Sequence, residues 1–160
     1  MTVDPLSEKW HRRFLNMATL VSTWSKDPST KVGAVIVRPE TRSIVSTGFN
    51  GLPRGIADND ERLRDREYKM LTTVHAEMNA ILHAARTGVL LEGCIMYCTW
   101  MPCAHCAAAI VQSGIRRVII PHLATIPERW RQSFDHASAT LWEARVDVAM
   151  LPANEDVVSF

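Results

Sequence analysis

The sequence lacks a surplus of charge of either sign. Its 160 residues include 18 lysines and arginines against 17 aspartates and glutamates, so the formal net charge is +1 at pH 7. Proteins that bind nucleic acid usually carry a basic excess or a basic stripe. The near balance therefore disfavours a nucleic-acid partner and favours a small-molecule substrate.

The sequence also lacks an apolar run long enough to span a membrane, and its first residues, which include Asp4, Glu8 and Lys9, contain no apolar core of a signal peptide. It has only four cysteines. Two belong to a metal-ligand pattern, and Cys94 and Cys98 lie in an apolar run typical of buried thiols. These features argue against a disulfide framework and predict a protein of the reducing cytoplasm with no membrane partner.

No internal repeat, low-complexity segment or linker divides the chain. The hydrophobic share of 47% and the charged share of 22% are ordinary for a globular domain. A chain of 160 residues can also enclose a sizeable core. We therefore predict a single domain over residues 1–160.

Apolar residues at helical or alternating spacing predict both helices and strands. The expected helices cover residues 6–25, 75–86, 103–113 and a last segment that begins at Pro127. The expected strands cover residues 32–37, 43–49, 94–99, 117–121 and 146–151. The highly charged residues 58–72 are expected to form a surface helix or an ordered excursion, and the tail after residue 151 is expected to fray.

The spacing also predicts which helical faces are buried. The expected inner faces are Trp10, Phe14, Met17, Ala18 and Val21 in the first helix, Met78, Ile81, Leu82 and Ala85 in the helix over 75–86, and Trp130, Phe134, Ala137 and Leu141 in the last. The order of elements indicates an α/β fold, a three-layer α/β/α sandwich with a five-stranded mixed sheet. Its first two strands should be antiparallel, and right-handed β-α-β connections should make the later strands parallel.

Four residues form a pattern typical of a catalytic zinc site: His75, Glu77, Cys103 and Cys106. One imidazole and two thiolates give three metal ligands, so the fourth tetrahedral position is left for a water molecule. Zinc lowers the pKa of such a water to about 7 and makes hydroxide available at neutral pH. We therefore expect one Zn²⁺ per subunit, with a bound water or hydroxide.

The spacing of these residues predicts where the metal lies. Cys103 and Cys106 are three positions apart and share a helix face, and Pro102 suits the first turn of that helix. His75 and Glu77 are two apart, so both can face one metal only from a helix N-terminus. We therefore expect two helix N-termini to converge on the zinc, with Glu77 free to move protons.

A structural zinc site is the alternative interpretation. It would need a fourth protein ligand, and His105 points away from the two cysteines if the segment is helical. A non-catalytic zinc-binding module also stays open, although the presence of Glu77 in the pattern favours an enzyme.

The pattern H-x-E…P-C-x-x-C is the signature of zinc-dependent nucleobase deaminases. With two further motifs and the extended segment around H-x-E, the chain resembles the cytidine/deoxycytidylate deaminase superfamily, and within it most closely the deoxycytidylate (dCMP) deaminases. These motifs are Lys26-Asp27-Pro28-Ser29-Thr30-Lys31-Val32-Gly33-Ala34, Gly48-Phe49-Asn50-Gly51-Leu52-Pro53-Arg54-Gly55 and His75-Ala76-Glu77-Met78-Asn79-Ala80-Ile81. The resemblance implies the cytidine deaminase-like fold and assembly as a homo-oligomer, from a dimer to a hexamer.

The resemblance also implies roles for single residues. His75, Cys103 and Cys106 would be the zinc ligands, Glu77 the catalytic proton shuttle, and Asn50 a hydrogen-bond partner of the sugar. Asn50 could instead be a turn asparagine before Gly51. Trp100 could stack on the base or belong to the core. Candidate cations for a phosphate, or else ordinary surface charges, are Lys26, Lys31, Arg54, His122 and Arg129.

The expected activity is hydrolysis of a C–N bond in a cyclic amidine, with dCMP converted to dUMP and ammonia in support of dTMP synthesis. In this hypothesis zinc-bound hydroxide attacks C4, while Glu77 takes the water proton and delivers it to N3 and then to the leaving amine. Other amino-heterocycles remain alternatives within this enzyme class: a modified deoxycytidylate, deoxycytidine, guanine, a pteridine or adenosine in tRNA.

Overall fold

A computed structural model of the chain describes residues 6–123 and 125–152. The expectation that the tail frays after residue 151 lies almost wholly outside the described residues. Along the chain the elements are α1 (Glu8–Ser22), β1 (Gly33–Arg38), β2 (Ser43–Phe49), α2 (Asp60–Arg64), α3 (Arg66–Thr72), α4 (Ala76–Thr87), β3 (Ile95–Cys98), α5 (Ala104–Gln112), β4 (Arg117–Pro121), α6 (Glu128–Glu143) and β5 (Asp147–Leu151).

The five strands form one mixed sheet in the order β2-β1-β3-β4-β5. β1 pairs antiparallel with β2 and with β3, whereas β3, β4 and β5 are parallel. The predicted strand directions are therefore confirmed, and β5 is an edge strand. None of the described helices is long and apolar enough to cross a membrane.

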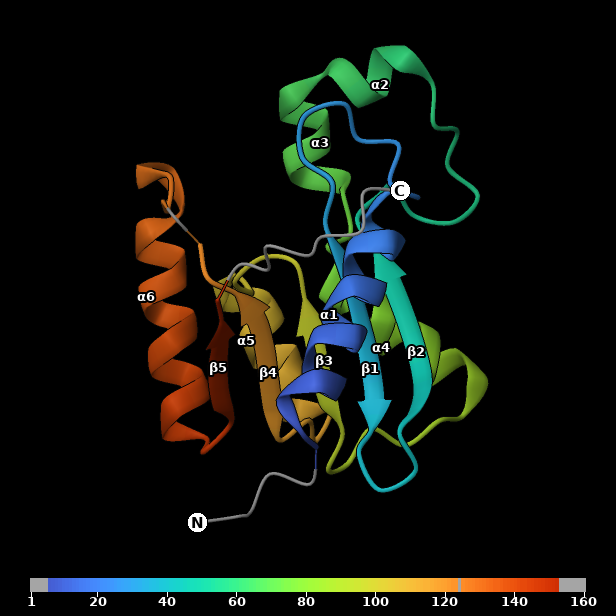
Figure 1. Ribbon diagram of the computed structural model, residues 1–160. Helices are drawn as coiled ribbons and strands as arrows, with labels where there is room; N and C mark the ends of the chain where they lie inside the picture. The colour runs from blue at the N-terminus through green and yellow to red at the C-terminus, as the bar shows by residue number, and fades with distance from the viewer. Residues whose placement is uncertain (1–5, 124, 153–160) are drawn as a thin grey trace.

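Helices cover both faces of the sheet, as Figure 1 shows. Alternate residues of β1 point to opposite faces: Ala34 and Ile36 join the core beneath α4, α5 and α6, while Val35 and Val37 join the core beneath α1. Burial of β1 on both faces follows from this arrangement and explains its continuous apolar run. The predicted three-layer α/β/α sandwich is confirmed.

The predicted buried face of α4 is wrong for Leu82 and Ala85, which are exposed, although Ile81 packs partly against the main core. The buried residues of α4 are Ala76, Glu77, Ala80 and Ala84, whereas Leu82 is 48% exposed. The cause is close packing of α4 on β2: a side chain at Gly48 would meet the backbone of Ala76 and Ala80. Small residues let a helix approach a strand this closely, so the larger apolar residues of α4 lie on its flanks and outer side.

Three further predictions need correction. α1 is shorter than residues 6–25, and Met17 is 38% exposed although it follows the helical spacing. Pro102 does not open α5, because Cys103 is the N-cap residue and Pro102 precedes it. In the last helix Phe134, Ala137 and Leu141 are buried and Trp130 packs partly against the same core, as predicted.

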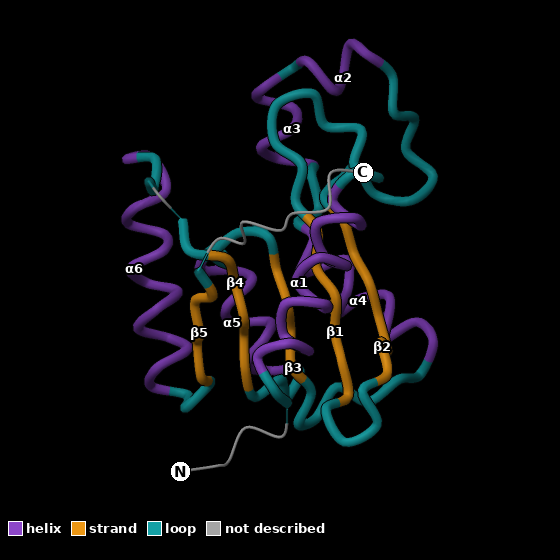
Figure 2. The backbone as a smooth tube through the Cα atoms, in the orientation of Figure 1, coloured by secondary structure: helices purple, strands orange, loops and turns teal. Residues whose placement is uncertain are grey.

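The highly charged residues 58–72 form two short helices, α2 and α3. Both helices belong to a longer stretch, residues 52–73, which we call the 52–73 segment. Neither helix buries a residue, which agrees with the predicted surface excursion. Figure 2 shows both helices at one end of the sheet, beside the loop that joins α1 to β1. This segment leads directly into Val74 and His75, so it ends at the candidate site.

Candidate metal and catalytic site

Two helices begin at the candidate site, as the spacing predicted. His75 is the N-cap residue of α4, and Cys103 is the N-cap residue of α5. Both residues have extended backbone conformations, which turn their side chains toward the space before the first helical turn. The positive ends of two helix dipoles therefore meet where thiolates and a carboxylate gather.

The ligand atoms of His75, Cys103 and Cys106 all lie within 4.8 Å of one another. The Nδ1 atom of His75 is 3.4 Å from the Sγ atom of Cys103 and 3.6 Å from that of Cys106. Tetrahedral zinc, bound at about 2.0–2.1 Å by nitrogen and about 2.3 Å by sulfur, would hold these atoms about 3.6 Å apart. The two distances from His75 to the thiols therefore match those of a zinc site.

The two cysteine thiols shift each other's pKa in opposite directions. A hydrogen bond with the Cys106 thiol lowers the pKa of Cys103 to about 3, and His75 lowers it further against the effect of burial. The same contact between the sulfur atoms raises the pKa of Cys106. One thiolate is thus already favoured, and a divalent cation would favour the second because metal binding displaces thiol protons.

Glu77 lies in the first turn of α4 and is only 3% exposed. Burial raises the pKa of Glu77 to about 7, and its own backbone N–H and the nearby His75 ring offset only part of this rise. A carboxyl group with such a pKa can both accept and release a proton near neutral pH. Its position beside the three ligands therefore suits proton transfer.

The fold fixes both helix starts by contacts with distant segments. The backbone of Val74 pairs with that of Gly51 through two hydrogen bonds, at 2.9 Å and 3.1 Å. The Ser133 hydroxyl of α6 accepts a hydrogen bond from the Ala104 N–H at 3.1 Å. Ser133 thus satisfies a free amide at the start of α5, a role that no local sequence pattern indicates because the two residues are 29 positions apart.

Asn50 follows β2 directly and is buried. Its Oδ1 atom accepts a hydrogen bond from the Val32 N–H at 2.8 Å, and its Nδ2 atom donates one to the Thr30 carbonyl at 2.9 Å. These bonds join Asn50 to backbone groups 18 and 20 positions away, and not to a local turn before Gly51. The amide has a second N–H, so a contact with a sugar stays a prediction.

The other predicted substrate contacts have different surroundings. Trp100 is partly buried and packs against the main core. Lys26 is exposed and pairs with Asp58 at 2.9 Å. Lys31 and Arg54 are exposed and make no hydrogen bond or ion pair within residues 6–123 and 125–152. The remaining candidate cations, His122 and Arg129, are also exposed.

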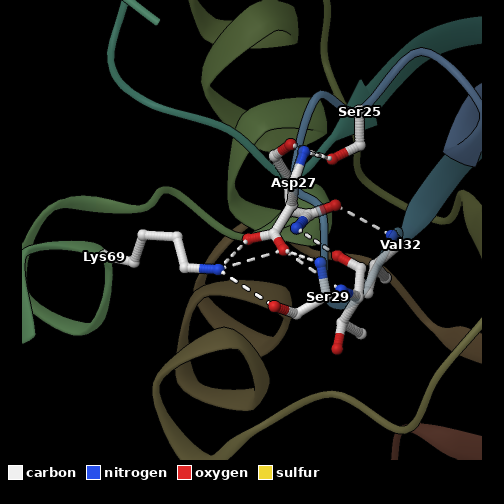
Figure 3. Close-up of polar contacts among 7 residues, drawn as sticks. Ser25, Asp27, Ser29, Val32 and Lys69 are labelled. Carbon is white, nitrogen blue, oxygen red and sulfur yellow. Dashed lines mark hydrogen bonds and ion pairs between the residues drawn. The ribbon is translucent and has the colours of Figure 1, made fainter. Parts of the chain in front are cut away.

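Sequence reasoning missed Lys69, which lies in α3. Its ammonium group contacts both carboxylate oxygens of Asp27 at 3.1 Å and the Ser29 hydroxyl at 3.4 Å (Figure 3). The sequence interpretation assigned the charged residues around it to a solvated surface. Hydrophobic patterning contains no signal that could have paired Lys69 with Asp27.

Fold and site together define a class of protein: an α/β/α sandwich with a three-ligand metal centre and an adjacent proton-transferring carboxyl group. The family model for the cytidine and deoxycytidylate deaminase zinc-binding region matches residues 8–122, and the chain belongs to this family. It is thereby placed in a class of hydrolases that act on C–N bonds.

Two relatives and one solved structure illustrate the similarity. An Aliivibrio fischeri protein described as an uncharacterized deaminase in the luxG 3′ region is 46% identical over 145 residues, which cover 90% of this chain and 95% of that protein. Human deoxycytidylate deaminase is 40% identical over 118 residues, which cover 69% of this chain and 64% of the human protein. The dCMP deaminase of cyanophage S-TIM5, solved with dCMP and dUMP, superimposes with a TM-score of 0.74 at 24% identity over 91% of this chain and 99% of the phage chain. At that identity the structural match shows the shared fold.

The named deoxycytidylate deaminases are longer than the matched region. The chain spans 64% of the human protein and 56% of the probable deoxycytidylate deaminase of Caenorhabditis elegans. It spans almost the whole of the Aliivibrio fischeri deaminase.

Proposed function

We propose that this protein is a zinc-dependent hydrolase that converts dCMP and water to dUMP and ammonia. The observation that carries the proposal is the Glu77 carboxyl group, buried beside a set of three metal ligands. A structural zinc takes four protein ligands, whereas a catalytic zinc takes three. His105, which stands between the two cysteines, is exposed and does not join the group found among the described residues.

The three ligands would hold one zinc ion per chain, with a water molecule in its remaining position. Zinc bound there supplies a Lewis acid that lowers the pKa of water to about 7. The two helix N-termini add positive potential at the same point. The chain's own contribution is to hold the ligands at suitable spacing before the metal arrives, because α4 and α5 are anchored by Gly51 and Ser133.

Glu77 moves the protons in the proposed reaction. A C4–O bond forms, and the C4–N bond to the exocyclic amine breaks. Glu77 takes one proton from the attacking water and delivers it to ring nitrogen N3, and it then passes the second proton to the amine, which leaves as ammonia. Burial raises the pKa of Glu77 to about 7, which suits a group that must accept and release protons.

The nucleotide would be recognised by residues around this centre. We assign Asn50 to the sugar, Trp100 to the base and the cations Lys26, Lys31 and Arg54 to the phosphate. Support for the phosphate role of Lys31 and Arg54 is that neither has a partner within the described part of the chain. The monophosphate itself is supported by the relatives named deoxycytidylate deaminase.

The proposal extends to oligomeric assembly and cellular location. We assign the protein to the cytoplasm, where dUMP would feed dTMP synthesis, and to a homo-oligomer between a dimer and a hexamer. Support for self-association comes from α3, whose Met70 and Leu71 are 73% and 84% exposed although both are large apolar residues.

A substrate panel tests the proposed function. Ammonia release would be measured from dCMP, deoxycytidine, CMP, cytosine and guanine at equal concentration. Turnover of dCMP far above that of deoxycytidine is the expected result. Faster turnover of an unphosphorylated base or nucleoside would contradict the assignment of the phosphate cations, and no turnover of any compound by the zinc-loaded protein would contradict the enzyme assignment.

A further inference from the structure

The loop between α1 and β1 is tied to the 52–73 segment by two ion pairs of opposite polarity. Lys26 pairs with Asp58 before α2, and the next residue, Asp27, pairs with Lys69 in α3. The two pairs differ in environment. The side chains of Lys26 and Asp58 are 68% and 32% exposed, whereas those of Lys69 and Asp27 are only 13% and 11% exposed.

The Asp27 carboxylate organises the 26–31 loop from inside. Its Oδ1 atom accepts hydrogen bonds from the N–H groups of Ser29 and Thr30, at 2.7 Å and 3.1 Å. Lys69 supplies the matching positive charge from the far side (Figure 3). Charged partners shielded from water interact more strongly than exposed ones, so Lys69 holds the carboxylate more firmly than a surface lysine would.

The end of this loop and the residues just after it are hydrogen-bonded to segments that lead toward the candidate site. Asn50 binds the loop end through the Thr30 carbonyl and the Val32 N–H. The backbone of Gly33 exchanges hydrogen bonds with Thr99, just before Trp100. Gly51, which follows Asn50, pairs with Val74, the neighbour of His75. The end of the 26–31 loop is therefore connected to the segments that lead into the two ligand-bearing helices.

The ion pair between Lys69 and Asp27 is not needed to fill the hydrophobic core. α3 buries no residue, and the 26–31 loop contributes no residue to either core cluster. What the pair fixes is the position of the loop backbone. That backbone carries Lys31, placed between the two residues that Asn50 binds.

We propose that Lys69 is a positioning residue for the nucleotide: through Asp27 it holds the 26–31 loop as one wall of the substrate site. This inference rests on the proposed function. Loss of the Lys69 charge frees the loop, so the substrate is bound less well while the metal ligands and Glu77 keep their places. The effect is therefore expected in KM rather than in kcat.

The test compares Lys69→Met and Lys69→Arg with the native protein. Arg64→Met is the matched control, because Arg64 lies in the same segment and its one ion pair among the described residues, with Asp60, is exposed. Each zinc-loaded protein is assayed for kcat and KM with dCMP, for zinc content and for thermal unfolding. We expect Lys69→Met to raise KM about tenfold with kcat nearly unchanged, because small displacements of positioning residues carry large kinetic costs. Lys69→Arg should restore most of the native KM, and Arg64→Met should match the native protein.

Each outcome bears on the inference. An unchanged KM in a folded Lys69→Met protein, or an equal rise in KM for Arg64→Met, overturns it. A loss of zinc from Lys69→Met also overturns the inference, since the Lys69–Asp27 pair would then position the metal ligands and not the substrate. If Lys69→Met does not fold, Asp27→Asn is assayed in its place, because asparagine keeps an acceptor for the Ser29 and Thr30 amides. A raised KM in Asp27→Asn supports the inference, and a native KM overturns it. A native protein that is inactive on dCMP would overturn the proposed function and this inference together.

Discussion

His75 Nδ1 lies 3.4 Å from Cys103 Sγ although 28 positions separate the two residues in the chain. Their proximity arises because each is the N-cap residue of a helix, α4 or α5, and because both helices pack on the same face of the sheet. An N-cap side chain lies at the helix end rather than on its flank. Two such ends can therefore share one metal, and Cys106 joins them from the first turn of α5.

Replacement of Glu77 by glutamine tests the proton-transfer role. Glutamine keeps the shape of the side chain but cannot carry a proton between water, ring and amine. We expect dCMP turnover to fall by about 10²- to 10⁴-fold, with zinc content unchanged. Turnover and metal content of the same preparation check this. Activity within a few-fold of the native value would show that another group transfers the protons.

Replacement of Cys106 by serine tests the metal assignment. A serine hydroxyl is a poor ligand for zinc, so we expect the purified variant to lose most of its zinc and to unfold at a lower temperature, because metal binding stabilises the folded state. His105→Ala is the control, since His105 is exposed beside Cys106. Equal zinc content in the native protein and in Cys106→Ser, measured by atomic absorption, would refute the ligand role.

Gly48→Ala tests the close packing of α4 on β2. The added methyl group would meet the backbone of Ala76 and Ala80, which cannot move aside as a flexible side chain would. We expect the free energy of unfolding to fall by about 3 kcal/mol. Gly51→Ala is the control, because a methyl group there meets nothing within 4 Å. Urea titrations of the two variants check the difference, and equal destabilisation would contradict the packing account.

The Asp27 carboxylate should make stability depend on pH. Burial alone would raise its pKa, but the Ser29 and Thr30 N–H groups and the Lys69 ammonium outweigh burial and hold the pKa of Asp27 below its ordinary value of 3.8. A carboxyl group with a lowered pKa stabilises the folded state above its unfolded-state pKa, and this contribution is lost as the pH falls through the folded-state pKa.

Asp27→Asn measures this contribution. We expect the variant to lower the free energy of unfolding by about 1–3 kcal/mol near pH 6. The difference from the native protein should shrink as the pH falls below about 4. Urea titrations from pH 6 down to well below pH 4 check the sign. A difference that is constant, or that grows in acid, would contradict the lowered pKa of Asp27.

Much of this arrangement can be predicted from sequence because it depends on local signals. Gly88 and Gly114 end or follow the two site helices with positive φ angles, and the alternating or continuous apolar runs mark the five strands. The spacing of His75, Glu77, Cys103 and Cys106 indicates helix N-termini without reference to the rest of the chain. The site is predictable for this reason.

The remaining features depend on contacts between distant segments. The alanine face of α4 becomes the inner face only because Gly48 lies opposite it. The antiparallel pairing of β1 with β3 places the hairpin against the parallel strands, and hydrophobic alternation contains no information about that neighbour. Lys69 and Asp27 are likewise joined by folding across 42 positions, so patterning could not distinguish this enclosed pair from surface charge.

The most direct test of the central claim is dUMP formation from dCMP by one preparation in three states: as purified, stripped of metal by a chelator, and reloaded with zinc. If His75, Cys103 and Cys106 hold a catalytic zinc beside Glu77, activity will disappear with the metal and return in proportion to zinc restored, up to one ion per chain. Activity that persists in the metal-free protein, or a fully reloaded protein that leaves dCMP unchanged, would contradict the account.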